Sequence, residues 1–376
     1  MVKLVIRQLQ LDPLRTVLTA LALASVIAVI LIFEGFLEGI VAQSRDAVLD
    51  RGADLIITQA GVKNMTLARS ILPQSARGEV EAIEGVRIAH PLTGIPVIYA
   101  EGGERAALLL FVYDTSGGPA RLVAGDGIAM PRGIIVDKSF AERFGLSVGD
   151  PLVISDFAFT VSGITQGASA FFSAFGFVRF DDLIDFYFES DLAADISTFP
   201  LLGFLLVDLE DGADRDAVAA SIEREVTSAD VFTPEAMANE DEALSRALLG
   251  PIIGFLIAVS YVSGALVTGI IMFAAVDARR GELGVMKALG YPNRFLALAV
   301  VTEALILICV ALPVGFVLAR AIAAGIEAGM PLYRVPVTET WPIARTAVAS
   351  VVFAVLGALM PVRLIRRLDP SLVFRG

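Results

Sequence analysis

Cysteine and histidine are almost absent from this chain of 376 residues, which has one of each. Cys309 alone cannot form a disulfide within the chain, and Cys309 with His90 alone cannot make a Cys/His zinc site. The sequence also lacks the GxxxxGK(S/T) loop that cradles nucleotide phosphates and the G-x-S-x-G motif of serine hydrolases. These absences exclude disulfide and Cys/His zinc sites within one chain. A nucleotide-hydrolysing loop would have to come from another chain.

Basic residues are scarce in the polar middle of the chain. Residues 42–247 contain 15 Lys and Arg against 32 Asp and Glu, a net charge of −17, so this block carries the acidity of the whole sequence. A polyanionic partner would be repelled by such a block. The composition therefore argues against a nucleic acid-binding protein.

Apolar residues make up 56% of the sequence and are clumped. Four runs, about residues 14–41, 248–276, 295–322 and 343–360, are long enough to cross roughly 30 Å of hydrocarbon as helices. The first run exceeds the apolar region of a signal peptide, so it is predicted to be an uncleaved anchor. The predicted fold class is a membrane protein, an α-helical bundle of four transmembrane helices, with a large extracytoplasmic α+β domain at residues 42–247 between helices one and two.

Lys and Arg gather in the short segments on one side of the predicted spans. They lie before the first span, in residues 277–294 between spans two and three, and in the tail at 361–376, whereas the opposite loop at 323–342 holds only Arg334. By the positive-inside rule both termini are predicted to be cytoplasmic and the large domain periplasmic or extracellular. Residues 1–13 place apolar and basic side chains on opposite helical faces, which predicts a short helix in the membrane interface.

The loop at 277–294 has the pattern of a short amphipathic helix. Leu283, Met286 and Leu289 recur at helical spacing, and charged residues occupy the remaining face. Gly290 and the residues after it are predicted to end this helix. A short helix held between two spans must either dock on a partner or lie on the lipid surface.

Within residues 42–247 the pattern changes to short strands and helices. Strands are predicted at 53–59, 87–99, 106–113 and 204–209, and helices at 78–84, 181–188 and 214–226. The stretch that begins at Gly133 indicates a compact β-rich unit of its own. A last helix is predicted to begin at Pro234 and to continue across Gly250 and Pro251 into span two.

Three stretches of the chain resemble the MacB/LolC/FtsX family of ABC transporter permeases, and the chain is close in size to the DevC-type members. The specific stretch is RRGELGVMKALGYPNRFLALAVVTEALIL from Arg279, whereas LRTVLTAL from Leu14 and RRLDPSLVFRG from Arg366 are weaker alone. The resemblance implies that the outer domain has a porter-like part at 43–130 and 199–240, split by an inserted β-rich unit at 131–198.

The same resemblance implies that the loop at 277–294 is a coupling helix that docks on a separate ATPase subunit, which binds ATP and Mg. This chain would then be non-catalytic, with no cofactor of its own and no metal. Gly284 and Ala288, four residues apart, are expected to allow close approach of that ATPase. The full set expected at the contact is Arg279, Arg280, Glu282, Gly284, Lys287, Ala288 and Gly290.

Further partners and a location follow from the resemblance. Family members work as paired permeases on paired ATPases, which implies a second copy of this chain in a homodimer or a sister permease in a heterodimer. A periplasmic adaptor protein and membrane lipids are also expected partners. The expected location is the bacterial inner membrane, with a multi-pass topology.

Three polar or small-residue features of the spans each allow two interpretations. Ser260, Gly264 and Thr268 form a small-residue face on span two, for packing within one subunit or for a dimer seam. Glu303 lies about two turns into span three, where a structural role is favoured over a proton path. At the outer end of span one, Glu34 shares a helical face with Glu38, and the two either rim a cavity or are solvated at the interface.

Phenylalanine is abundant in the segment at 131–198, and most of these side chains are predicted to be core. The exception is the glycine-bounded run GASAFFSAFGF, which contains Phe171, Phe172 and Phe175. This run allows two interpretations, either packing in the core like the other phenylalanines or a mobile apolar loop that meets a lipid-like substrate or a periplasmic partner.

Three functions compete. Transport predicts that ATP binding closes the spans and outer domains and extrudes or releases an amphipathic, lipid-like substrate by mechanical transmission. The alternative is an FtsX-like signalling subunit that activates a periplasmic partner such as a cell-wall hydrolase. An enzyme in the outer domain is the weakest, because a Ser/His triad has only His90 available. Transport is favoured because the outer domain is large and has two parts.

Overall fold

The computed structural model describes residues 2–128, 130–190 and 202–367. The chain divides into two compact units. Unit one comprises residues 1–38, 250–328 and 335–376, and unit two comprises residues 39–249 and 329–334. Parts of two expected segments, 191–198 of the inserted unit and 368–376 of the tail, lie outside the described residues, as do 199–201 of the porter-like part.

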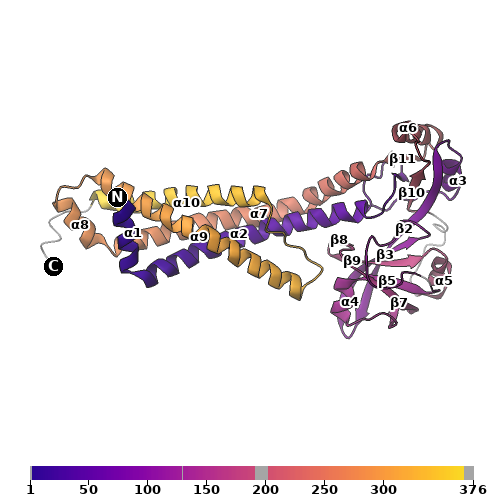
Figure 1. Ribbon diagram of the computed structural model, residues 1–376, viewed down its shortest axis with the longest axis horizontal. Helices are drawn as coiled ribbons and strands as arrows, with labels where there is room; N and C mark the ends of the chain where they lie inside the picture. The colour runs from indigo at the N-terminus through magenta and orange to yellow at the C-terminus, as the bar shows by residue number, and fades with distance from the viewer. Residues whose placement is uncertain (1, 129, 191–201, 368–376) are drawn as a thin grey trace. The chain divides into compact units, whose positions relative to one another are not determined.

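Unit one is helical, because apolar runs in lipid can satisfy their backbone hydrogen bonds only within helices or closed barrels. The helices that contribute to it are α1 Val2–Leu11, α2 Pro13–Leu49, α7 Pro234–Asp277, α8 Arg280–Ala288, α9 Asn293–Gly329 and α10 Thr340–Arg367 (Figure 1). Among the described residues, α2, α7, α9 and α10 are long and apolar enough to cross a membrane. This confirms the predicted four-helix membrane fold, and α7 does run unbroken from Pro234 through Pro251.

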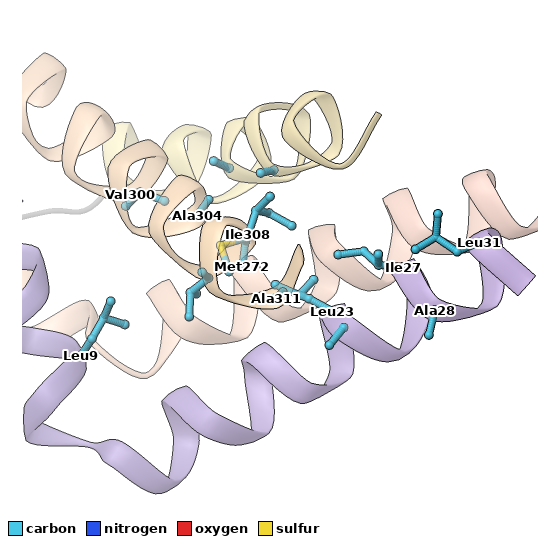
Figure 2. Packing of buried hydrophobic residues seen from close by; sticks show 14 of the residues in the cluster. Leu9, Leu23, Ile27, Ala28, Leu31, Met272, Val300, Ala304, Ile308 and Ala311 are labelled. Atoms are coloured by element: carbon cyan, nitrogen blue, oxygen red, sulfur yellow. The ribbon is translucent and has the colours of Figure 1, made fainter. Parts of the chain in front are cut away.

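The core of unit one consists of apolar side chains from all six helices. Figure 2 shows Leu23 and Ile27 of α2 in the same cluster as Met272 of α7 and Ile308 of α9. Alanines lie among these larger residues, which allows neighbouring helices to approach closely. The N-terminal helix α1 belongs to the same core through the buried side chain of Val5. Its apolar face therefore packs on the bundle.

Unit two contains a mixed sheet with short helices (Figure 1). In the described part of the chain, its strands are β1 Leu55–Gln59, β2 Val86–Glu101, β3 Glu104–Tyr113, β4 Leu122–Gly125, β5 Gly133–Asp137, β6 Pro151–Ile154, β7 Phe157–Thr165, β8 Ser169–Ala170, β9 Ser173–Arg179, β10 Phe204–Leu209 and β11 Ala229–Phe232. Its short helices are α3 Ser75–Glu81, α4 Lys138–Phe144, α5 Asp182–Glu189 and α6 Arg215–Glu225. The strands pair in the order β11-β1-β10-β2-β3-β9-β5-β7-β4, with β6 on β7 and β8 on β9. This confirms the α+β domain predicted between spans one and two.

The long hairpin of β2 and β3 lies at the centre of the sheet order. Its two-residue turn is Gly102-Gly103, both with positive φ, which suits the primed turns that connect twisted strands. On the far side of the hairpin, β9 pairs in parallel with β3, from Leu108 opposite Ala174 to Tyr113 opposite Arg179. The strands of residues 131–190 thus continue one sheet with the strands before and after them in the sequence.

Two clusters of buried apolar side chains pack the short helices against the two ends of this sheet. The first packs α3 and α6 on β1, β2 and β10, with Val80 and Ile222 both fully buried. The second fills the space between the hairpin, α4, α5 and β5 to β7, and includes Phe157 and Phe159, each 1% exposed. These phenylalanines are buried in the core, as predicted.

Asp241 of α7 is a buried carboxylate that holds a loop of unit two. It is 0% exposed and accepts hydrogen bonds from the backbone N–H groups of Met65 at 2.8 Å and Thr66 at 3.1 Å, and from the Thr66 hydroxyl. Burial raises the pKa of Asp241 above its ordinary value of 3.8, outweighing the hydrogen bonds from Thr66 and Met65. The pKa of Asp241 in the folded protein is higher than its ordinary value of 3.8. The contribution of Asp241 to stability is therefore fully present below pH 3.8 and is lost as the pH rises through the folded pKa.

Asp241→Asn is expected to destabilise unit two by about 2 kcal/mol. An asparagine side chain has only one acceptor oxygen, so its NH2 group would face N–H or O–H donors of Met65 and Thr66 that now bond to the carboxylate. The substitution should also remove the part of the pH dependence that Asp241 supplies. The control is Glu240→Gln, the same chemical change at an exposed neighbour. Thermal unfolding of the full chain in detergent checks this, and equal melting temperatures for both variants would contradict it.

Candidate functional site

The helix α8 lies between the membrane helices α7 and α9, within the loop that the sequence predicts to be an amphipathic helix. It ends as predicted at Gly290, whose φ of +91° suits the left-handed position after a helix. The N–H of Tyr291 donates to the carbonyl of Met286 at 3.1 Å, and the N–H of Gly290 donates to that of Lys287 at 3.1 Å. This pair of bonds is the Schellman motif, so the C-terminal end of α8 is well defined.

One face of α8 is buried in unit one. Leu283 is 8% exposed and belongs to the bundle core, Gly284 beside it is also buried, and Met286 packs at the edge of that core. Lys287 is half-buried on the same side. The expectation that Gly284 allows close approach of the partner is corrected, because this glycine is buried within the chain itself.

The other face of α8 is exposed and largely apolar. Val285 is 45% exposed and Leu289 is 73% exposed, with Ala288 between them and Glu282 one turn before. The sequence pattern placed Leu289 on one helical face with Leu283 and Met286, but Leu289 is the C-cap residue that follows the last helical residue, and it is exposed. Tyr291, 44% exposed, follows Gly290, and its ring centroid lies 5.2 Å from that of Phe295. We call Glu282, Val285, Ala288 and Leu289 the outer face of α8.

An ion pair lies at the start of α8. The guanidinium of Arg279 lies 3.2 Å from Oε1 and 3.4 Å from Oε2 of Glu303 on α9, and the two side chains are only 16% and 10% exposed. Close by in the helix bundle, Arg15 of α2 donates to the carbonyl of Ala274 at 2.9 Å. The pairing of Glu303 with Arg279 supports a structural role for this carboxylate. Arg280 is the first residue of α8.

Glu34 and Glu38 differ in their surroundings. Glu34 is 2% exposed, its Oε1 lies 2.7 Å from a guanidinium nitrogen of Arg345 on α10, and it accepts the hydroxyl of Tyr261 on α7 at 2.9 Å. Glu38 is half-buried. The expectation that Glu34 rims a cavity or is solvated at the interface is corrected, because two partners far away in the sequence enclose it.

The small-residue face of α7 packs within the chain. A Cβ on Gly264 would lie 2.7 Å from Val26 Cγ1 on α2, and a Cβ on Gly357 of α10 would lie 3.2 Å from Thr268 Cγ2. Gly264 and Thr268 are buried, whereas Ser260 is half-buried and donates to its own helix at the carbonyl of Leu256. These contacts support packing inside one subunit.

The phenylalanine run forms the β8–β9 hairpin, and its members differ in exposure. Phe175 is 0% exposed and packs edge-on against Phe111, with ring centroids 4.9 Å apart, so it is not available to a substrate. Phe171 and Phe172 form the turn, both with positive φ, a conformation that bulky residues rarely adopt. Phe172 is 41% exposed, and its ring centroid lies 5.9 Å from that of Tyr333. The expectation of a substrate-facing run is thus corrected for Phe175.

Several residues of these sites were not found from the sequence. Arg345 and Tyr261 meet Glu34 only in the folded bundle, and no local signal links them. Val285 and Leu289 carried a weak signal, since both are apolar residues in a polar loop.

Four membrane-spanning helices and a large domain between the first two define a multi-pass membrane protein with an extracytoplasmic domain. Residues 16–225 match the family model described as MacB-like periplasmic core domain, and residues 254–370 match that described as FtsX-like permease C-terminal. The chain belongs to this MacB/FtsX-type family of ABC transporter permeases.

Relatives and solved structures are similar to this chain over different lengths. Uncharacterized ABC transporter permeases of Mycobacterium bovis and Mycobacterium tuberculosis are 22% identical to it, over 99% of this chain and 98% of theirs. The periplasmic region of MacB from Actinobacillus actinomycetemcomitans has a TM-score of 0.36 and 11% identity, over 51% of this chain and 94% of that one. The extracellular domain of the transporter YknZ from Gram-positive bacteria has a TM-score of 0.35 and 11% identity, over 48% of this chain and all of its own.

Proposed function

We propose that this permease couples ATP hydrolysis by a separate ATPase subunit, loaded with ATP and Mg, to extrusion or release of an amphipathic, lipid-like substrate on the periplasmic side. The outer face of α8 is the observation that carries this proposal. It presents Val285 and Leu289 on a short helix whose opposite face is packed in the bundle. Exposed apolar residues on a fixed helix suit a pocket in a partner, and the charge of Glu282 suits setting its register.

The proposal places the ATPase on the cytoplasmic side. The loop of α8 and both chain termini carry the basic residues. By the positive-inside rule, these segments lie on the cytoplasmic side of the bacterial inner membrane. An ATPase of this type works in pairs, which favours two permease subunits, either two copies of this chain or this chain with a sister permease. A periplasmic adaptor would meet the outer domain.

Mechanical transmission is supported by the helix pair in unit two. Residues 39–49 of α2 and 234–249 of α7 are joined by a hydrogen bond of 2.8 Å between the hydroxyls of Ser245 and Ser44, both fully buried. Beside it, Arg45 donates to Asn239 Oδ1 at 2.7 Å. Helices that are hydrogen-bonded to each other can move as one body, which a segment that transmits motion must do. We call residues 39–49 of α2 and 234–249 of α7 the stalk.

At the end of α2, Arg51 connects this stalk to the sheet. Its guanidinium lies 5.4 Å from the ring centroid of Phe111 on β3 and 5.0 Å from that of Phe177 on β9, and donates to the carbonyl of Gly117 at 2.8 Å. Burial lowers the pKa of Arg51 to about 10, which still leaves it charged at neutral pH. Because β3 and β9 lie on either side of the expected boundary at residue 131, one side chain holds both parts of the domain.

The segment 329–334 supplies a second connection within unit two. Gln43 of α2 donates to the carbonyl of Leu332 at 2.8 Å and to Ser169 Oγ at 3.1 Å, and Arg334 donates to Asp46 Oδ2 at 2.9 Å. The side chain of Leu332 packs on the apolar cluster that includes Phe157 and Phe159. In the proposed mechanism, a shift of α9 and α10 would therefore act on the outer domain through this segment as well as through the stalk.

The test of the proposal is hydrolysis by the separated and the combined subunits. The purified chain alone is expected to hydrolyse no ATP, and activity should appear when it is combined with the ABC ATPase that co-purifies with it from its own membranes. Reconstitution in proteoliposomes with Mg·ATP and a phosphate-release assay measures both. Robust turnover by the lone, contaminant-free chain would overturn the assignment.

A further inference from the structure

We propose that Glu303 is a positioning residue for α8. Through its ion pair with Arg279, it fixes the direction in which the outer face of α8 is presented. This inference rests on the proposed docking of α8 on an ATPase. It assigns the carboxylate a task in that docking rather than in proton movement.

The first observation is the way α8 begins. Arg279 occupies the N-cap position, and its carbonyl accepts the N–H of Leu283 at 3.0 Å, but its own side chain makes no capping hydrogen bond to the helix. Side-chain caps normally satisfy the free N–H groups of the first turn. The C-terminal end, in contrast, has its Schellman bonds. The start of α8 is therefore the end that depends on tertiary contacts.

The second observation is that Arg279 and Glu303 form a bidentate ion pair at the start of α8. Both carboxylate oxygens of Glu303 face the guanidinium of Arg279, at 3.2 and 3.4 Å, and both side chains are largely buried. Paired contacts of this kind restrict the direction of approach as well as the distance. The pair joins the N-cap of α8 to the first third of the long membrane helix α9, which is a fixed support.

Other charged side chains near Glu303 also depend on its negative charge. Besides Arg279, the charged groups that act on this carboxylate are Arg15, from α2, and Glu282, from the first turn of α8. Arg15 also donates to the carbonyl of Ala274 in the last turn of α7. One carboxylate thus balances the basic groups of two segments that meet at the start of α8.

Loss of this carboxylate has a defined consequence. A nine-residue helix is too short to be stable alone, so its orientation depends on its contacts. Without Glu303, the guanidinium of Arg279 would be buried without its partner, which is costly, and it would turn out toward water and take the first turn of α8 with it. Only a fraction of molecules would then present the outer face correctly, and the apparent affinity for the ATPase would fall by that fraction.

The first experiment measures the order of α8 without any partner. A spin label is placed at Ala288→Cys in a Cys309→Ala background, since Cys309 is the only native cysteine, and the full chain is reconstituted in liposomes. Glu303→Gln is expected to increase the mobility of the label, and the exchanged pair Arg279→Glu with Glu303→Arg should restore only part of the native spectrum, because a cation at position 303 then faces Arg15. Glu327→Gln, on the same helix, is the control, because its carboxylate accepts the N–H of Val335 at 2.8 Å, away from α8. An unchanged spectrum in Glu303→Gln would overturn the proposal.

The second experiment measures binding of the co-purifying ABC ATPase. Glu303→Gln is expected to weaken association about tenfold, while the stimulated turnover rate at saturating ATPase changes by less than about twofold, because only the orientation of the helix is lost. If Glu303→Gln fails to fold, Glu303→Asp retains the charge one methylene short and should give an intermediate loss. If Leu289→Asp weakens binding and neither Glu303 variant does, the positioning role fails alone. If none of them weakens binding, the docking role fails too.

Discussion

Leu289→Asp, just after the last residue of α8, is expected to weaken binding of the ABC ATPase at least about 30-fold and to abolish permease-stimulated hydrolysis. Leu289 is 73% exposed, so the substitution removes a large apolar contact without disturbing the bundle core. Truncating a central interface residue costs about 2 kcal/mol or more, and a carboxylate placed in an apolar pocket adds its own desolvation cost. Co-purification and phosphate release in proteoliposomes measure the two effects.

Two further changes on the same face test its shape and charge. Glu282→Lys and Ala288→Trp should leave membrane insertion intact and lower ATPase association. Gln10→Asp, on the exposed side of α1, is the charge control, and Val317→Trp, 66% exposed on α9, is the bulk control. Full-strength binding and stimulation in all three α8 variants would show that the helix only lies on lipid, as the competing hypothesis requires.

Gly264→Leu is expected to destabilise the helix bundle by about 3 kcal/mol, at the upper end of the usual cost of overpacking. Even a Cβ at this position would lie 2.7 Å from Val26 and 3.7 Å from Phe353, so α7 must move away from both α2 and α10. The matched control is Gly254→Leu on the same helix, where a Cβ meets nothing within 4 Å. Thermal unfolding of the full chain in detergent compares the two.

The same pair of variants separates the two interpretations of the small-residue face. Packing inside one subunit predicts a lower melting temperature for Gly264→Leu alone. A dimer seam predicts instead an unchanged melting temperature of the monomer and a loss of dimer mass. An unchanged melting temperature and an unchanged mass would remove Gly264 from close helix packing altogether.

Local signals made the helices of this protein predictable. Each of the four apolar runs is long enough to span a bilayer as a helix. The helix α7 continues through Pro251, because a break would leave backbone groups without hydrogen bonds in lipid. The end of α8 was equally predictable, because Gly290 is the residue that takes a left-handed conformation without strain. Such signals lie within a few residues of the feature they specify.

The direction in which a helix faces was not predictable in this way. Gly284 turns inward and Leu289 outward because α8 is held by Leu283 and by Glu303, and the latter is 24 positions from its partner. Glu34 meets Arg345 across 311 positions. A single sequence carries no record of such pairs, so these ion pairs appear only in the fold.

The outer domain shows the same limit. Its strands follow alternating and apolar patterns, but the parallel pairing of β9 with β3 joins residues 108–113 to residues 174–179. The buried place of Phe175 depends on that pairing, since it packs on Phe111 of β3. Sequence spacing alone favoured a loop at this position because small residues surround the phenylalanines.

Photo-cross-linking from the outer face of α8 shows whether this face docks on an ABC ATPase. A benzophenone amino acid is placed at Val285, which is 45% exposed, and at Leu283, which is 8% exposed, and native membranes are irradiated with and without Mg·ATP. We expect a covalent adduct between the chain and an ABC ATPase from position 285 and none from position 283. Adducts with lipid alone at position 285, or equal ATPase adducts from both positions, would contradict it.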